Sequence, residues 1–186
     1  RLPRAAVVGG AAVAVTARIP LLPAEEHERR QRRANSALQP LWDLLDAVVD
    51  PEIPVVSLWQ LGVLQDIALE DGVVVVTITP TYSGCPAMTV MAEDVQQALA
   101  DAGYPHSRIV TKLSPAWSTS WMADDAREKL RAYGIAPPGE NEAAPVHCPR
   151  CGSGRVRTVS QFGSTACKAL YQCGDCAELF DYFKPI

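Results

Sequence analysis

Apolar and polar positions along the chain follow two periods, one typical of helices and one typical of strands. Apolar residues recur at helical spacing in three segments, whereas a run of β-branched residues at 73–79 predicts a buried strand. The turn signal Glu70-Asp71-Gly72 pairs that strand with the segment before it, because glycine adopts the positive φ that a tight hairpin needs. The pattern predicts helices and strands in the order α-β-β-α-β-α, over residues 36–50, 63–69, 73–79, 87–102, 109–113 and 124–133. This order predicts an α+β fold in which helices pack on a small sheet.

A second, smaller pattern follows towards the C-terminus. Three short strands are predicted over residues 155–162, 168–172 and 179–183. The stretch between the two patterns contains Pro137-Pro138-Gly139 and two glutamates, which is the composition of a linker. We therefore expect four parts: a lead-in at 1–35, a main domain at 36–135, a linker at 136–145 and a small domain at 146–186.

The lead-in fits neither pattern. Its apolar run at 5–15 is shorter than the roughly 20 residues that span a bilayer. The run also resembles the apolar part of a signal peptide, but export would carry the cysteines described below into an oxidising compartment. Residues 25–33 are dense in charge and predict a solvated helix or a disordered segment. We expect residues 1–35 to be disordered or foreign to the native chain.

Charge is distributed unevenly over a mildly acidic chain of net charge −4. Residues 36–135 contain 13 acidic and 5 basic residues, so the main domain would repel phosphates. The small domain, with 5 basic and 3 acidic residues, is only weakly positive. The composition excludes a nucleic-acid partner and gives no sign of a membrane partner, while open sheet edges leave homo-oligomers possible.

Four of the six cysteines form two Cys-x-x-Cys pairs in the small domain. Two residues between thiolates let both sulfurs of a tight turn reach one ion, and four sulfurs close a tetrahedral zinc site. With the three predicted strands, this indicates a zinc ribbon in which Zn²⁺ is structural. An iron–sulfur cluster is the alternative, because four cysteines suit both. The expected ligands are Cys148, Cys151, Cys173 and Cys176.

A fifth cysteine, Cys85, lies in the corner between the strand at 73–79 and the following helix. Pro86 suits the first position of that helix, so Cys85 falls at the positive end of its dipole. A thiol there tends to have a lowered pKa and to bind metal or attack electrophiles; the alternative is a buried cysteine that acts as a small hydrophobe. Asp50 and Glu52 bracket a proline, and are either solvated turn carboxylates or the acidic edge of a metal or partner site.

The sixth cysteine, Cys167, lies between two predicted strands of the small domain. Four ligands already close a tetrahedron, so Cys167 is not expected to bind the zinc. It is either a buried residue, which we favour, or a second reactive thiol whose pKa is lowered by Lys168.

Six short motifs lie along both domains: Asp50-Pro51-Glu52-Ile53-Pro54, Thr81-Tyr82-Ser83-Gly84-Cys85-Pro86, Ser114-Pro115-Ala116-Trp117, Cys148-Pro149-Arg150-Cys151-Gly152, Ser164-Thr165-Ala166-Cys167-Lys168 and Phe180-Asp181-Tyr182-Phe183. These motifs resemble those of the PaaD family of phenylacetate-degradation proteins, and the main domain resembles the wider SufT-like family of iron–sulfur assembly factors. The resemblance covers residues 36–186 and joins two independent domains in the same order.

The resemblance implies a cytoplasmic, non-catalytic accessory protein of the phenylacetyl-CoA 1,2-epoxidase system. Its partners would be the di-iron oxygenase subunit, the reductase subunit that carries an iron–sulfur cluster, or both. The chain would assist assembly of one of these centres, with Cys85 as the working thiol beside Asp50 and Glu52 and with iron or a cluster held transiently. The alternative function is a thiol-dependent enzyme or redox protein that uses Cys85, which requires a base that only folding could supply.

Overall fold

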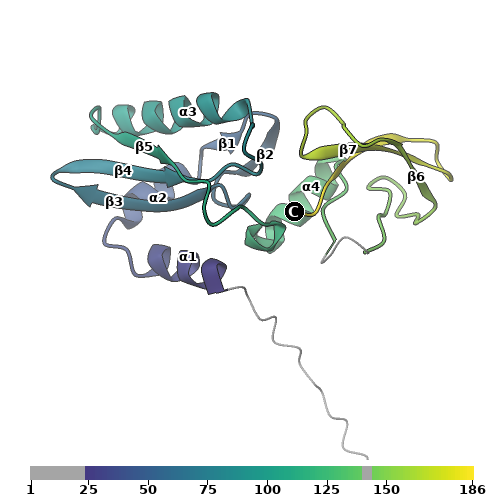
Figure 1. Ribbon diagram of the computed structural model, residues 1–186, viewed down its shortest axis with the longest axis horizontal. Coiled ribbons are helices and arrows are strands. Elements are labelled where there is room, and N and C mark those ends of the chain that lie inside the picture. The colour runs from purple at the N-terminus through teal and green to yellow at the C-terminus, as the bar shows by residue number, and fades with distance from the viewer. Residues whose placement is uncertain (1–23, 140–143) are drawn as a thin grey trace, which may run out of the picture.

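The computed structural model describes residues 24–139 and 144–186, and it contains two domains that lie end to end (Figure 1). The signal-like run at 5–15 lies outside the described residues. The helices are α1 (Ala24–Ala34), α2 (Gln39–Leu45), α3 (Ala87–Asp101), the 3₁₀ turn η1 (Thr119–Trp121) and α4 (Asp124–Tyr133). The strands are β1 (Val49–Asp50), β2 (Ile53–Ser57), β3 (Leu64–Glu70), β4 (Val73–Ile78), β5 (Arg108–Thr111), β6 (Val156–Ser160), β7 (Lys168–Cys173) and β8 (Leu179–Phe183).

The sheet of the first domain has the strand order β3-β4-β5. β3 and β4 form the predicted antiparallel hairpin, in which Asp71 and Gly72 both have positive φ. β5 pairs with β4 in parallel, because α3 connects the two strands as a crossover. α3 runs along one side of this sheet and α1 along the other (Figure 1). The α+β prediction is confirmed.

A two-stranded ribbon, β1 with β2, was not predicted. The sequence indicated a rigid extended crossing around Pro51 and Pro54, and the backbone is indeed extended there. However, Asp50 and Ile53 lie opposite each other, so the segment folds back on itself in a tight turn. Pro54 is tolerated because β2 has a partner on one side only and Pro54 is exposed. This turn places both carboxylates of the segment at the edge of the domain.

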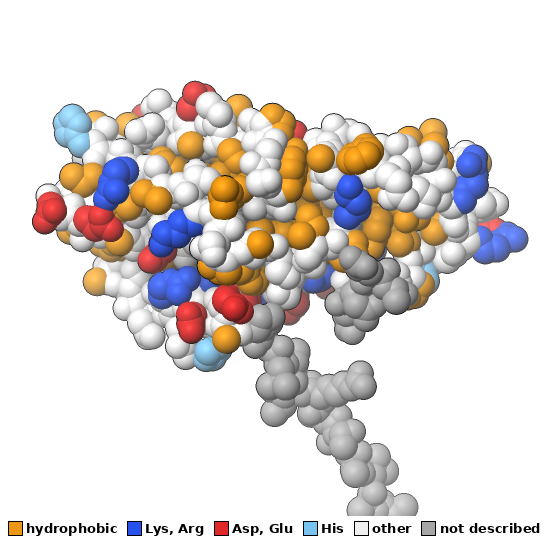
Figure 2. Space-filling model, viewed as in Figure 1, with side chains coloured by type: hydrophobic (Ala, Val, Ile, Leu, Met, Phe, Trp, Pro, Cys, Tyr) orange, Lys and Arg blue, Asp and Glu red, His pale blue; other side chains and the backbone are white. Residues whose placement is uncertain are grey.

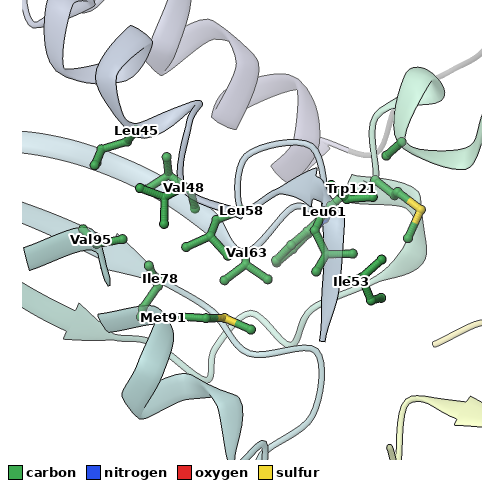
Figure 3. Close-up of a cluster of buried hydrophobic side chains, with 14 of the residues drawn as sticks. Leu45, Val48, Ile53, Leu58, Leu61, Val63, Ile78, Met91, Val95 and Trp121 are labelled. Carbon is green, nitrogen blue, oxygen red and sulfur yellow. The ribbon is translucent and has the colours of Figure 1, made fainter. Parts of the chain in front are cut away.

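The main core lies between the sheet and its helices (Figure 3). Val63, just before β3, and Ile78 of β4 lie near Met91 and Val95 of α3, and all four side chains are buried. Leu45 from α2 closes the same cluster. Burial of aliphatic side chains of this size contributes roughly 1.5–3 kcal/mol each, so the cluster holds the strand-to-helix corner after β4 in a fixed position.

The prediction that residues 25–33 form a solvated or disordered lead-in is wrong, because α1 has one buried face. Arg29 is 1% exposed, pairs with the buried Glu26 at 2.7 Å and stacks 3.9 Å from the Trp59 ring. Its guanidinium also donates to the backbone oxygens of Leu64 (3.0 Å) and Trp121 (2.9 Å). Charge density alone suggested solvent, but an arginine with five donors can be buried when acceptors surround it.

The second domain is an antiparallel sheet in the order β6-β7-β8, as predicted. It is packed on the first domain: Phe183 of β8 is fully buried in the main core, with its ring 5.9 Å from that of Trp117. Ala136 donates to the backbone oxygen of Asp181 (2.8 Å) and accepts from the backbone N–H of Phe183 (2.9 Å). The first residue of the expected linker, Ala136, is therefore hydrogen-bonded to β8. Residues 140–143 of the linker lie outside the described part.

The surface view is consistent with a joined pair of domains. On the face shown in Figure 2, hydrophobic side chains gather over the middle of the molecule, where the domains meet. Among residues 24–139 and 144–186, no helix combines the length and apolar character needed to cross a bilayer.

Candidate metal and thiol sites

The four predicted ligands of the small domain come together at one point. Cys148 and Cys151 lie on the turn before β6, whereas Cys173 ends β7 and Cys176 follows in the next turn. All four sulfurs lie within 4.8 Å of one another, and the Cys148–Cys176 and Cys151–Cys173 sulfur pairs are 3.7 and 3.6 Å apart. No other set of three or more candidate ligands within the described ranges is this compact.

These distances fit a metal ion. Four sulfurs at about 2.3 Å from a tetrahedral centre are about 3.8 Å apart, close to the two shortest distances here. The backbone also supports the turns: Gly152, with φ of 75°, donates to the Cys148 oxygen at 2.9 Å, and Asp175 donates its N–H to the Cys173 sulfur at 3.4 Å. The cluster can bind a metal ion.

Cys85 lies at the corner between β4 and α3, as predicted. Pro86 occupies the N-cap position of α3, so Cys85 is the residue just before the cap. Cys85 is half-buried and packs against the main core.

The predicted lowering of the Cys85 pKa is wrong. Burial raises the pKa of the Cys85 thiol, and the carboxylates of Glu52 and Asp50 raise it further. The Ala87 N–H at the start of α3 and the Tyr82 hydroxyl act in the opposite direction but do not compensate. Two nearby negative charges and loss of water outweigh a helix terminus, because the dipole amounts to a fraction of one charge.

Asp50 and Glu52, which the sequence left open, are part of this site but differ from each other. Asp50 is 5% exposed, and its Oδ1 accepts from the backbone N–H groups of Glu52 (2.8 Å) and Ile53 (3.0 Å). It therefore holds the turn. Glu52 is only half-buried, and its pKa is raised by burial and by the Asp50 charge. Two carboxylates beside Cys85 form an acidic edge, so the solvated-turn alternative does not hold for Asp50.

Cys167 belongs to the second domain but packs into the core of the first. It is 7% exposed and belongs to the core cluster of the first domain, so the favoured interpretation of a buried cysteine is confirmed. Its pKa is raised, first by burial; the Thr165 hydroxyl, 3.0 Å from the sulfur, and the Lys168 charge oppose this. The carboxylates of Glu52 and Asp50 raise the pKa of Cys167 as they do that of Cys85.

Lys168 and Tyr82 complete a group that we call the junction site: Asp50, Glu52, Tyr82, Cys85, Thr165, Cys167 and Lys168. Lys168 is 3% exposed, and its Nζ lies 3.7 Å from Asp181 while its charge acts on both site carboxylates. The pKa of Tyr82 is raised to about 12, first by burial and then by the Cys85 and Cys167 thiols.

Sequence reasoning placed Cys85, Asp50 and Glu52 together but missed the contribution of the second domain. The run Ser164-Thr165-Ala166-Cys167-Lys168 carried a signal, since hydroxyls, a thiol and an amine crowd into one hairpin loop. The sequence could not show that this loop packs on the first domain. Gly163 shows how tight the loop is, because a Cβ there would lie 2.4 Å from the Asp181 carboxylate.

Both domains match known protein families. Residues 136–184 match the family described as PaaD zinc beta ribbon domain, and residues 38–107 match the family described as iron–sulfur cluster assembly protein. The chain is 45% identical over 151 residues to an Escherichia coli protein named as a putative subunit of 1,2-phenylacetyl-CoA epoxidase, covering 78% of this chain and 92% of that one. The chain belongs to the PaaD family.

The first domain of this PaaD family member has further relatives. It is similar to the Fe–S protein maturation auxiliary factor YitW from Bacillus subtilis, with 36% identity over 90 residues that cover 48% of this chain and 80% of the relative. A solved structure from Bacillus anthracis, described as a domain of unknown function, DUF59, is 26% identical and matches with a TM-score of 0.45 over 56% of this chain and 95% of its own.

Proposed function

We propose that the chain is an accessory factor that assists assembly of an iron–sulfur or di-iron centre in a phenylacetyl-CoA epoxidase. Membership in the PaaD family and likeness to iron–sulfur maturation factors support an accessory role in iron–sulfur assembly. The epoxidase oxygenase and reductase subunits are the proposed partners, in the cytoplasm, where thiols stay reduced.

The observation that carries the proposal is the position of Cys85. Cys85 is a half-buried residue in the β4–α3 corner, and the charges of two carboxylates, Glu52 and Asp50, act on its thiol. Thiolate and carboxylate are both iron ligands, and a partly open site allows an ion or cluster to enter and leave. The proposal assigns Cys85 as the thiol that holds iron transiently, with Glu52 and the turn-forming Asp50 beside it.

The alternative, a thiol enzyme or redox protein, has less support. A nucleophilic cysteine works as a thiolate and is activated by a lowered pKa or a neighbouring base. Here the pKa of Cys85 is raised by burial and by two carboxylates. Such surroundings oppose a free thiolate at neutral pH but suit a thiol whose proton is released to solvent when a metal cation binds the sulfur.

The four-cysteine cluster has a separate proposed role. We assign it structural Zn²⁺, because four thiolates without an open position make a closed site. Its ligand spacing and its place in a ribbon of about 40 residues indicate that the ion supplies much of the folding energy of this domain. One colourless zinc per chain is expected from elemental analysis, whereas a brown protein with visible absorption would assign an iron–sulfur cluster instead.

The test uses Cys85→Ser. The epoxidase oxygenase and reductase subunits are co-expressed with the wild-type chain, with the variant or with no third chain, and the iron content of each purified subunit is measured. We expect the variant to fold and to leave one subunit with the low iron content found when the chain is absent. Thr89→Ala, an exposed substitution one turn into α3, is the matched control and should behave as wild type.

Normal iron content and epoxidase activity with Cys85→Ser would refute the proposed role of the thiol. A deficit in the reductase subunit alone would identify the iron–sulfur centre as the client, and a deficit in the oxygenase alone would identify the di-iron centre.

A further inference from the structure

We propose that the outer edge of β5, together with the groove between β5 and α3, binds an extended segment of a partner protein that has acidic residues at both ends. The segment would add a fourth strand to the sheet of the first domain, a mode of recognition in which main-chain hydrogen bonds give affinity and side-chain pockets give specificity. The inference goes beyond the proposed function, because it assigns a recognition surface that is separate from the thiol chemistry.

Four strands lie at the outer edges of the two three-stranded sheets, and three of them are distorted or covered. The register of β3 is irregular between Leu64 and Asp66, and that of β6 is irregular between Thr158 and Ser160. β8 is covered, because Ala136 is hydrogen-bonded to its outer side. Bulges and covering segments are common ways to keep an edge from pairing. Among these four edge strands of the described residues, β5 alone has a regular register and no segment paired to its outer side.

The backbone groups of β5 point alternately to β4 and to the free edge. The Lys112 N–H donates at 2.9 Å to the backbone oxygen of the last residue of β4, so Lys112 faces the sheet. Because this direction alternates along a strand, Ile109 and Thr111 direct their N–H and C=O groups outwards. In the described part of the chain, neither residue has a backbone hydrogen bond outside the sheet. The preceding outward carbonyl, on Ser107, accepts from the Gln96 side chain at 3.3 Å and marks the end of the free edge.

A groove of about 520 Å³ lies beside this edge, between α3 and β5. Met88 and Ala92 of α3 line it together with Ile109, and all three residues are half-buried. Side chains of an added strand that lie opposite Ile109 and Thr111 would enter this groove, because directly opposite residues share one face of a sheet. Glu93 also lines the groove, so its charge disfavours acidic side chains there. The groove therefore selects apolar side chains at these two positions.

Two exposed cations, Arg108 and Lys112, lie at the two ends of the same edge. Side chains alternate between the faces of a sheet, so both belong to the face opposite to that of Ile109. Arg108 pairs with Glu70, whereas Lys112 has no ion-pair partner among the described residues. An added strand would place residues four apart opposite these two cations, and carboxylates at both positions would complement the charges.

The same charges disfavour a second copy of this chain as the added strand. The antiparallel register that pairs the outward residues Ile109 and Thr111 with each other is centred on Val110. This register places Arg108 of each copy opposite Lys112 of the other, and like charges directly opposite each other are destabilising. A segment with carboxylates there forms two ion pairs instead. The expected segment therefore has the order acidic, apolar, variable, apolar, acidic.

One end of the groove lies close to Cys85 along the chain. Met88, which lines the groove, is in the first turn of α3, and its N–H donates to the backbone oxygen of Cys85 at 3.4 Å. A protein held by this edge would therefore have its neighbouring residues near the thiol to which the proposed function assigns iron.

The experiment measures binding of a labelled peptide to the full chain with zinc in its ribbon. The probe has the core Asp-Val-Thr-Val-Asp between glycines, with both termini capped, and the comparison peptide has Lys in place of each Asp. Fluorescence anisotropy should show binding of the Asp peptide and at least about tenfold weaker binding of the Lys peptide. The difference should shrink at high salt, because exposed charges are screened.

Amide hydrogen exchange locates the bound peptide without any substitution. In the free chain, the amides of Ile109 and Thr111 should exchange fast, whereas that of Val110, which faces β4, should exchange slowly. The Asp peptide should protect Ile109 and Thr111 and leave Val110 unchanged.

Two variants test the backbone and the charge separately. Thr111→Pro removes one outward N–H without removing a bond to β4, and it should weaken binding of the Asp peptide at least about tenfold. Thr111→Val keeps the N–H and should bind as wild type. Lys112→Glu should weaken binding a few-fold, whereas Arg157→Glu, an exposed change on the edge strand β6, should not. The exchange measurement on wild-type chain covers the case in which Thr111→Pro folds poorly.

The outcomes separate this surface from the thiol. Equal binding of both peptides, or exchange at Ile109 and Thr111 that does not change with the Asp peptide, would overturn the proposal. A dimer that forms with rising concentration and protects these two amides, without peptide binding, would assign the edge to a second copy. None of these results changes the iron content of the client subunits, which decides the role of Cys85, so the two proposals can fail independently.

Discussion

The two sulfur-rich regions of this chain use the same side chain in opposite surroundings. In the ribbon, four cysteines on two short turns have sulfurs within 4.8 Å of one another, and two of them are exposed. At the junction, two cysteines from different domains lie among carboxylates, an ammonium and a phenol. The first arrangement is already shaped for a metal ion, whereas in the second burial and negative neighbours raise the pKa of both thiols.

The two regions differ in how completely they could surround a metal ion. A closed set of four thiolates satisfies the ion completely and leaves no position for a client's ligand. A partly buried thiol outside such a set keeps room for other ligands. The chain therefore combines a compact four-cysteine cluster with a half-buried cysteine in different surroundings.

The largest effect is expected from breaking the ribbon cluster. Removal of its metal with a strong chelator, or Cys173→Ala, should unfold the second domain, because structural zinc sites contribute about 10–16 kcal/mol in small zinc-binding peptides. Amide spectra should lose the dispersed signals of β6 to β8. Loss of Phe183 from the core should also lower the melting temperature of the first domain. A ribbon that keeps its spectrum without metal would contradict the role assigned to the ion.

A smaller effect should follow when the domains are separated but the ribbon cluster is kept. Phe183→Ala removes a fully buried ring that contacts Trp117, and a large-to-small change of this kind costs about 3–5 kcal/mol. Zinc content should remain one per chain, while Cys167, which is buried in the same core, should become accessible to alkylation. Leu179→Ala, on the exposed face of the same strand, should change the stability by less than about 0.5 kcal/mol. An unchanged alkylation rate of Cys167 in Phe183→Ala would show that the docked ring does not keep this cysteine buried.

The smallest effect tests the electrostatics of the junction alone. The Glu52 charge raises the pKa of Cys85, so Glu52→Gln should lower that pKa and increase the rate of alkylation of Cys85 near neutral pH by a few-fold. The pH–rate profile should shift towards lower pH, because the thiolate forms earlier once a negative neighbour is removed. Zinc-bound thiolates in the ribbon should show no such shift.

Glu93→Gln is the control for this last change. Glu93 is exposed on α3 and is not among the groups that act on Cys85, so its profile should match wild type. Equal profiles for all three proteins would mean that Glu52 does not act on the thiol.

The sequence alone determined the ribbon and most elements of the first domain. The Cys-x-x-Cys pairs could be interpreted directly because metal geometry restricts their spacing, and the β-branched run before Cys85 predicted β4 because such residues fit a buried strand. The acidic neighbours of Cys85 were also found in advance, from the residues that bracket Pro51 and from family motifs.

Only the tertiary structure decided the sign of the Cys85 pKa shift, the burial of Arg29 and the burial of Cys167 in the core of the first domain. Each depends on contacts between residues far apart in the chain: two carboxylates from another turn, the backbone oxygens of Leu64 and Trp121, and the packing of the second domain on the first. A local pattern reports periodicity, turns and ligand spacing. It does not show which charged residues, distant in the chain, lie beside a buried thiol. At Cys85 those charges set the direction of the pKa shift.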